Sequence, residues 1–141
     1  MIVADASGLL AAFGRDQRDY ARARAAFESD PGPIVLSPYV LAELDYHLLK
    51  RHGIDAELHL LADVAAGVFE LATFSSNDVA RAVSVITKYG DLRIGIADAS
   101  LVVLAERYGT TRILTLDERH FRVIRPLHAD AFTLLPADTP A

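Results

Sequence analysis

The chain has 141 residues, 52% of them hydrophobic and 23% charged, a composition that excludes a disordered protein. It contains no cysteine, which excludes disulfides, thiolate metal sites and cysteine nucleophiles. The formal net charge of −5 argues against a nucleic-acid partner, although a carboxylate cluster that binds a metal ion would invert this effect locally.

The first half of the chain alternates apolar runs with helical patterns. Buried strands are predicted over residues 2–5 and 34–36. Helices are predicted over residues 7–13, with Ser7 as the N-cap, and from 16 or 19 to 28. A third helix runs from Pro38 to residue 51, with Ser37 as its N-cap and Gly53 as its stop, and a fourth covers residues 55–66.

The second half continues the alternation. A strand is predicted over residues 68–72, then a helix from 75 or 76 to 88 or 89, a loop over 91–95 and an apolar helix over 96–108. Two further strands are predicted over residues 112–116 and 131–135. Strands that alternate with helices indicate an α/β fold, with a central parallel sheet flanked on both faces by helices. With no linker in the sequence, residues 1–141 are expected to form a single domain.

The ends of the chain carry no recognisable targeting or membrane segment. The N-terminal sequence Met-Ile-Val-Ala-Asp lacks a basic region, so a signal peptide is not predicted. No apolar run approaches the roughly 20 residues of a membrane span. We therefore expect a cytoplasmic protein that does not interact with a membrane, and the absence of cysteine suits that compartment.

Four acidic residues border apolar segments, where an isolated charge is costly. Asp5 and Asp117 each follow a predicted strand, Asp98 opens the apolar helix, and Glu43 lies on the apolar side of its helix. In open parallel sheets, ligands bind beyond the carboxyl ends of the strands. We expect all four carboxylates to meet at that edge, where a bound cation would compensate their charge.

The first two acids also have ordinary structural readings. Asp5 would cap the helix that follows it, although Ser7 is placed to do this and would leave Asp5 free. Glu43 would be a solvated helix residue, but Asp45 is the better candidate for that role. Helical periodicity turns Asp45 away from the apolar side of the helix.

The other two acids have comparable alternatives. Asp98 would interact with the helix dipole in the first turn, and Asp117 would begin a turn. Asp91 lies in a loop and is read as a turn residue. His120 and His47 lie one turn from an acid of the set, which allows an active-site role for each, although a surface or packing role is the commoner reading of a lone histidine. No single one of the four acids indicates a metal site, whereas the four together do.

All-oxygen carboxylate sites select hard cations such as Mg²⁺ or Mn²⁺. Because Mg²⁺ in proteins usually lies between carboxylates and phosphate oxygens, the set indicates phosphoryl-transfer chemistry. No residue is placed as a covalent nucleophile with its base. The sequence has neither a Walker P-loop nor a G-x-G-x-x-G motif, so nucleoside triphosphate and dinucleotide binding are not predicted.

The motifs around the four acids resemble those of a known family. These motifs are Asp5-Ala6-Ser7 after the first strand, Val40-Leu41-Ala42-Glu43-Leu44, Gly95-Ile96-Ala97-Asp98-Ala99 and Thr115-Leu116-Asp117-Glu118-Arg119-His120-Phe121. In this order, and on a chain of this length, they resemble the PIN-domain ribonucleases, most closely the VapC-type toxins of bacterial type II toxin–antitoxin systems. The resemblance runs from Ile2 to about Leu135 and implies the PIN-like three-layer sandwich.

The resemblance also implies an activity and a site. The chain is expected to be an endoribonuclease that depends on Mg²⁺, which Mn²⁺ can replace. It would hydrolyse phosphodiester bonds in structured RNA, either tRNA or ribosomal RNA. Such cleavage would inhibit translation and growth. Asp5, Glu43 and Asp98 would be the core metal ligands, and Asp117 would complete the acidic pocket, with one or two ions. Ser7 and Thr115 match polar positions beside that pocket.

Partners follow from the same resemblance. A homodimer is expected, neutralised by a cognate VapB-type antitoxin in a toxin–antitoxin hetero-oligomer. The antitoxin tail would lie in an apolar groove for which five residues are candidates, although ordinary core positions are the favoured reading: Leu9, Phe13, Tyr20, Phe27 and Leu48. RNA would be held by local arginines, the candidates being Arg15, Arg93, Arg112 and Arg119.

Two other classes of protein remain as alternatives. A metal-dependent phosphatase of the haloacid type would require a second aspartate where Ser7 stands, and a receiver domain would require paired acids after the first strand with a later lysine partner. Neither pattern is present. A non-catalytic PIN-like binding module is the other alternative, and the four intact acids argue against it.

Overall fold

A five-stranded parallel sheet forms the centre of the structure, a computed structural model that describes residues 1–140. The strands lie in the order β3-β2-β1-β4-β5, and every neighbouring pair is parallel. Their bounds are β1 Ile2–Ala4, β2 Ile34–Leu36, β3 Glu70–Leu71, β4 Arg112–Leu114 and β5 Thr133–Leu135. Each predicted strand is present; β2 has the predicted bounds, and the other four strands are shorter than the sequence pattern predicts.

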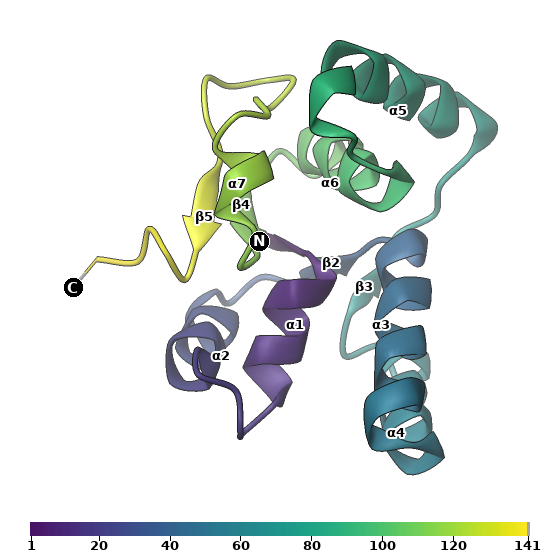
Figure 1. The fold of residues 1–141 in the computed structure, drawn as a ribbon, viewed down its shortest axis with the longest axis vertical. Helices are drawn as coiled ribbons and strands as arrows, with labels where there is room; N and C mark the ends of the chain where they lie inside the picture. Colours follow the sequence, from purple (N-terminus) through teal and green to yellow (C-terminus); the bar gives the residue numbers. More distant parts are fainter. Residues whose placement is uncertain (141) are drawn as a thin grey trace.

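Helices flank the sheet in two layers, which confirms the predicted three-layer α/β architecture. One layer contains α1 (Ala6–Phe13), α2 (Tyr20–Ser29), α3 (Pro38–His52) and α4 (Ile54–Ala65). The other contains α5 (Ser76–Lys88), the 3-10 helix η1 (Gly90–Leu92), α6 (Ile96–Arg107) and α7 (Glu118–Phe121). Figure 1 shows the two groups on opposite sides of the strands, with α5 to α7 above and α1 to α4 below.

The order of the strands determines where a ligand site can form. From β1 the chain moves outward to β2 and then β3, and it then returns past β1 to β4 and β5. Because parallel crossovers are right-handed, this reversal of direction places the later helices on the opposite face. Strands β1 and β4 are neighbours whose connections leave in opposite directions. The crevice beyond their carboxyl ends is the topological switch point of the sheet.

Side-chain hydrogen bonds cap the N-termini of α3 and α1, and the cap of α1 differs from the one predicted. The Ser37 hydroxyl accepts a hydrogen bond from the Tyr39 amide and caps α3, as predicted. Asp5, rather than Ser7, caps α1, because its carboxylate accepts from the Ala6 amide. Ser7 already lies within the first turn of α1. The prediction that Asp5 is free of a capping role was therefore wrong.

Helix α6 is the most deeply buried helix, because it lies between the sheet and α5. All seven residues from Ala99 to Ala105 are buried, including the polar Ser100. The Ser100 hydroxyl lies 2.7 Å from the hydroxyl of Ser37, and it donates to the carbonyl of Ala97 at 2.6 Å. This buried hydroxyl pair joins the N-terminal ends of α3 and α6, the two helices that carry Glu43 and Asp98.

Among the helices of residues 1–140, none combines the length and the apolar character that crossing a bilayer requires.

Candidate active site

The four predicted acids lie around the switch point of the sheet. Asp5 follows β1 and Asp117 lies just beyond β4, and these two strands pair in parallel register. Asp98 lies in the first turn of α6. Glu43 lies in the second turn of α3, which begins directly after the neighbouring strand β2. The carboxyl ends of β1 and β4 and the first two turns of α3 and α6 thus bring the four carboxylates to the same edge of the sheet.

Asp5 is the most enclosed of these acids, and only 7% of it is exposed. Its Oδ1 accepts a hydrogen bond from the Ala6 amide at 2.9 Å. Its Oδ2 accepts from the hydroxyls of Thr115 at 2.8 Å and Ser7 at 2.9 Å. Burial raises the pKa of Asp5, although these three hydrogen bonds favour the charged form and oppose the effect. The three donors hold the carboxylate in one orientation.

Ser7 and Thr115 also order the loop that carries Asp117. The amide of Leu116 donates to Ser7 Oγ at 3.0 Å, and the amide of Asp117 donates to Thr115 Oγ1 at 2.9 Å. The two hydroxyl oxygens lie 3.2 Å apart. Both residues therefore contact Asp5 and the β4–α7 loop at once, and they couple the positions of two acids.

Asp98, Asp117 and His120 form the tightest group in the site. One potential ligand atom from each lies within 4.8 Å of the others. His120 Nδ1 is 2.9 Å from Asp117 Oδ2 and 3.7 Å from Asp98 Oδ2. The geometry of these ion pairs is not that of a hydrogen bond, so Nδ1 is a buried nitrogen without a hydrogen-bond partner in residues 1–140. Asp5 and Glu43 lie outside this tight group.

The electrostatic coupling extends over all four acids. Burial raises the pKa of Asp98 to about 6, with further contributions from the charges of Asp5, Asp117 and Glu43, while His120 opposes the shift. Burial and the charge of Asp5 also raise the pKa of Glu43, and the charge of His47 lowers it. These carboxylates are close enough to repel one another, and the imidazoles of His120 and His47 only partly offset the effect on the pKa values of Asp98 and Glu43.

These observations fit a divalent cation. The donor set consists of carboxylate oxygens with one imidazole nitrogen, which suits Mg²⁺ or Mn²⁺. The raised pKa values of Asp5, Glu43 and Asp98 describe negative charge that a cation would stabilise. The unpartnered Nδ1 of His120 faces the same space.

Sequence reasoning left three contributors to this site unassigned. The role of His120 was open, and its position three residues after Asp117 was the available signal. The buried pair Ser37 and Ser100 had no such signal, because their contact joins residues 63 positions apart. Helix α7 was also missed, since the only local structure considered for this segment was a turn starting at Asp117. The Asp117 carboxylate caps that helix by accepting from the His120 amide at 3.0 Å.

The structure separates other residues from the site. Asp91 is exposed in η1 and is not part of the acidic group. The prediction that Asp45 is solvated was wrong, because it is half-buried and its Oδ1 is enclosed without a hydrogen-bond partner in the described chain. Helix α3 packs against both α1 and α4, so it has more than one buried side.

An apolar groove of about 540 Å³ runs between α1, α3 and α4. Leu9, Phe13 and Leu48 line it, whereas Tyr20 and Phe27 do not. Phe27 instead packs edge-on against Phe13 with the ring centroids 5.1 Å apart.

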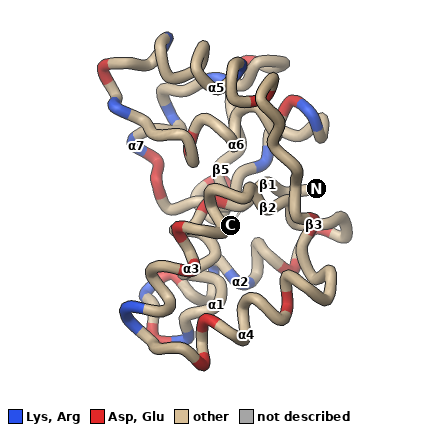
Figure 2. Tube along the Cα trace, turned by 90° about the vertical axis from the view of Figure 1, so that its right-hand side faces the viewer, with Lys and Arg blue, Asp and Glu red and all other residues tan. Residues whose placement is uncertain are grey.

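The candidate RNA-binding arginines lie in different places. Arg15 lines the apolar groove. Arg112 starts β4, at the edge of the sheet opposite the acids, and pairs with Asp30 at 3.1 Å. Arg93 and Arg119 are exposed in the layer that contains α6 and α7. Figure 2 shows that Lys and Arg occur in both helical layers.

The chain is similar to proteins of known family and structure. The family model described as PIN domain matches residues 2–126. Ribonuclease VapC26 of Mycobacterium tuberculosis (strain ATCC 25618 / H37Rv) is 47% identical over 135 residues, which cover 96% of this chain and 100% of that protein.

Two solved structures share the fold. One is the crystal structure of Mycobacterium tuberculosis VapC20, a sarcin-ricin loop cleaving toxin, with a TM-score of 0.76 at 18% identity over 84% of this chain and 92% of the other. The second is a toxin–antitoxin complex from Klebsiella pneumoniae, with a TM-score of 0.67 at 21% identity over 88% of this chain and 92% of the other.

Proposed function

The chain belongs to the PIN-domain family, within the VapC ribonucleases, and we propose that it is a divalent-metal-dependent endoribonuclease toxin. Its substrate is a structured RNA, either tRNA or ribosomal RNA, in which it hydrolyses phosphodiester bonds and thereby inhibits translation and growth. Residues 1–141 act as one domain. The cytoplasm is the compartment in which this substrate occurs.

One observation supports this proposal most strongly: several carboxylates converge at the switch point, where burial, together with the charges of the neighbouring acids, raises the pKa of Asp98 to about 6. We assign Asp5, Glu43, Asp98 and Asp117 as ligands, directly or through water, of Mg²⁺, which Mn²⁺ can replace. When bound, the cation lowers the pKa of a coordinated water and stabilises negative charge on the phosphate.

The residues of the chain have distinct tasks in this proposal. Ser7 and Thr115 hold the Asp5 carboxylate in a fixed orientation through hydrogen bonds of 2.9 and 2.8 Å. Such contacts to a ligating carboxylate orient it and tune its affinity for the metal. Nδ1 of His120 lies 2.9 Å from Asp117 Oδ2 and 3.7 Å from Asp98 Oδ2, where it can join these carboxylates as a nitrogen ligand of the cation.

A cognate VapB-type antitoxin is the proposed inhibitor, and the apolar groove between α1, α3 and α4 is its proposed binding site. The side chain of Phe13 lines the groove and is 45% exposed, which is unusual for a phenylalanine that also packs against two other aromatic rings. The complex from Klebsiella pneumoniae is a precedent for antitoxin binding on this fold. We further propose that the toxin is a homodimer within a toxin–antitoxin hetero-oligomer.

Cleavage of total cellular RNA by the purified protein tests the enzymatic proposal. The reaction is run with Mg²⁺ or Mn²⁺ and with EDTA, and Asp98→Asn is compared with Asp91→Asn, an exposed acid outside the cluster. Discrete fragments that require metal and Asp98, but persist with Asp91→Asn, are expected. Cleavage in EDTA, or cleavage by Asp98→Asn at the wild-type rate, would contradict the proposal.

The alternatives predict other results in the same experiment. A binding module would retain RNA without producing fragments. A phosphatase would release inorganic phosphate from a phosphomonoester and leave the RNA chain intact.

A further inference from the structure

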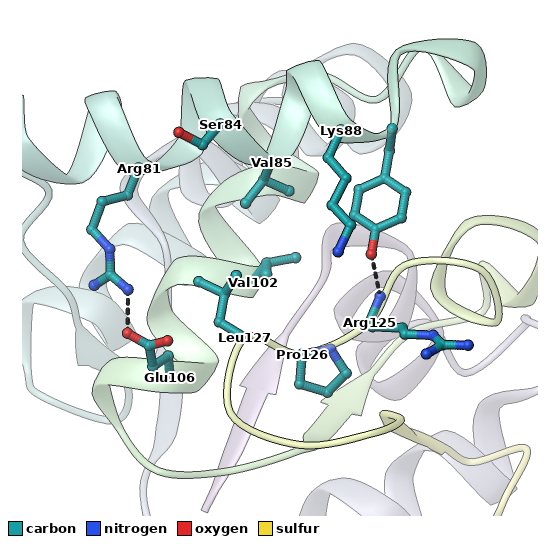
Figure 3. Close-up of a pocket in the computed structure, with 10 residues that line it drawn as sticks. Arg81, Ser84, Val85, Lys88, Val102, Glu106, Arg125, Pro126 and Leu127 are labelled. Atoms are coloured by element: carbon teal, nitrogen blue, oxygen red, sulfur yellow. Dashed lines mark hydrogen bonds and ion pairs between the residues drawn. The ribbon is translucent and has the colours of Figure 1, made fainter.

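A second cleft lies outside the acidic site, between α5, α6 and the segment that follows α7. Its volume is about 440 Å³. The buried side chains of Val85 and Val102 contribute an apolar floor, and Arg81, Lys88 and Arg125 bring three cations to its walls. Figure 3 shows Arg81 and Glu106 joined at one end of the cleft, with Lys88 and Arg125 at the other.

The two ends of the cleft differ in charge compensation. Arg81 forms an ion pair with Glu106, so its charge is balanced. Neither Lys88 nor Arg125 forms an ion pair with any acid in residues 1–140. The dipole of α5 accounts for a lysine in its last turn, but it does not account for Arg125. A local excess of positive charge therefore remains, in a chain whose net charge is −5.

Tyr89 contacts both Lys88 and the backbone of the segment that carries Arg125. Its hydroxyl accepts a hydrogen bond from the backbone amide of Arg125 at 3.0 Å, which fixes the 125–127 segment against α5. The ammonium of Lys88 lies over the ring of Tyr89, 5.4 Å from its centroid. Positive groups beside an aromatic ring and an apolar floor are the combination by which proteins bind single-stranded nucleic acid.

The cleft and the acidic site share helix α6. Asp98, Val102 and Glu106 are spaced four residues apart and follow one side of α6. The cleft floor at Val102 is thus only about 6 Å along the helix axis from Asp98. The opposite wall, residues 125–127, follows α7, which carries His120. A nucleotide close to one cleaved at the acidic site can reach this cleft.

We propose that this cleft binds the RNA substrate next to the cleavage site, with Lys88 and Arg125 each contacting a backbone phosphate. The inference rests on the proposed ribonuclease function and adds the place where the substrate is held. The proposed contact also explains how an acidic protein can bind RNA, since Lys88 and Arg125 place positive charge beside the RNA next to the carboxylate cluster. The ligand is the sugar-phosphate backbone, so the contact is independent of base identity.

The test uses the double variant Lys88→Gln/Arg125→Gln, placed on an Asp98→Asn background so that RNA is bound without being cut. Both side chains are exposed, which favours an intact fold. The matched control is Arg18→Gln/Lys50→Gln, which removes the same charge from exposed, unpaired cations in the other layer. Fluorescence anisotropy measures the affinity for labelled bulk bacterial tRNA between about 50 and 200 mM salt.

Two lost phosphate contacts reduce the slope of log affinity against log salt by about 1.4, and the affinity falls about tenfold. The control variant keeps the wild-type slope. Equal effects in the two variants, or no effect in either, would overturn the proposal. So would a change of oligomeric state in light scattering without a change in RNA affinity, because the cleft would then be an interface between copies.

Cleavage of total RNA by the same charge variants, without Asp98→Asn, separates this inference from the proposed function. If the protein with Asp98 intact cleaves RNA and the double variant keeps its full kcat/KM, only the cleft proposal fails. If no RNA is bound or cleaved by any form, both proposals fail. A loss of about tenfold in kcat/KM, absent from the control, is the expected result.

Discussion

Replacement of Asp98 by asparagine is expected to stabilise the metal-free protein at neutral pH. Burial, with the charges of Asp5 and Asp117, raises the pKa of Asp98 to about 6 from an ordinary value of 3.8. A carboxyl group with a raised pKa favours folding only while it is protonated. Stability is therefore lost as pH rises from the unfolded pKa through the folded one, that is, between about pH 4 and pH 6. Asparagine, which does not ionise, escapes this loss.

The size of the effect follows from the shift. A displacement of about two pKa units corresponds to about 3 kcal/mol of unfolding free energy at pH 7 and above. Because the Asp98 side chain is only 22% exposed, solvent screening reduces this value modestly. Well below pH 3.8 the carboxyl group is protonated in both the folded and the unfolded state, and the difference between wild type and Asp98→Asn vanishes.

Urea denaturation with EDTA at pH 4 and pH 7.5 measures this difference, with Asp91→Asn as the exposed control. Mn²⁺ at about 1,000 times its Kd should reverse the order, since it adds about 4.1 kcal/mol to a protein that binds it, which exceeds the difference of about 3 kcal/mol. An Asp98→Asn protein that is less stable than wild type at pH 7.5 without metal would refute the reasoning. A gain of equal size at both pH values would do the same.

Two further substitutions test the structure around the site. Thr115→Val removes a hydroxyl that donates to the buried Asp5, so it should lower the free energy of unfolding in urea by about 1.5–3 kcal/mol. The control Thr87→Val, on the exposed side of α5, should change this free energy by less than about 0.5 kcal/mol. Equal costs in the two variants would contradict the role of the buried hydroxyl. Gly8→Ala places a Cβ against the backbone of β4 and should lower the free energy of unfolding by about 1–3 kcal/mol. In the control Gly90→Ala, the added Cβ meets no atom within 4 Å. If Gly8→Ala left thermal unfolding unchanged, α1 would not pack this closely on the sheet.

The alternation of strands and helices, and the four acids, could be recognised from the sequence because both are local patterns. Buried strands in a parallel sheet are continuous apolar runs, and Ser37-Pro38 is a strong helix start. Asp5 rather than Ser7 caps α1, and the Asp5 carboxylate also accepts a hydrogen bond from Thr115, which lies 110 positions away in the sequence. No local pattern reports that contact.

Other features depended on tertiary structure in the same way. Helix α7 has four residues, which is too short for a helical period to be visible. Asp45 was misplaced because a single amphipathic face was assumed for α3, whereas α4 packs against a second side. The cleft brings together Lys88 and Arg125, which are 37 positions apart, and no local sequence pattern marks either residue.

Mn²⁺ titration of the wild-type protein, Asp98→Asn and Asp91→Asn tests most directly whether the carboxylates at the switch point form one cation site. Wild type and Asp91→Asn should bind Mn²⁺ with the same affinity, and Asp98→Asn should bind at least about tenfold more weakly. Affinity in the wild-type protein should also fall as pH decreases through about 6, where Asp98 takes up a proton. Equal affinity in all three proteins would contradict the account, because the ion would then be bound elsewhere.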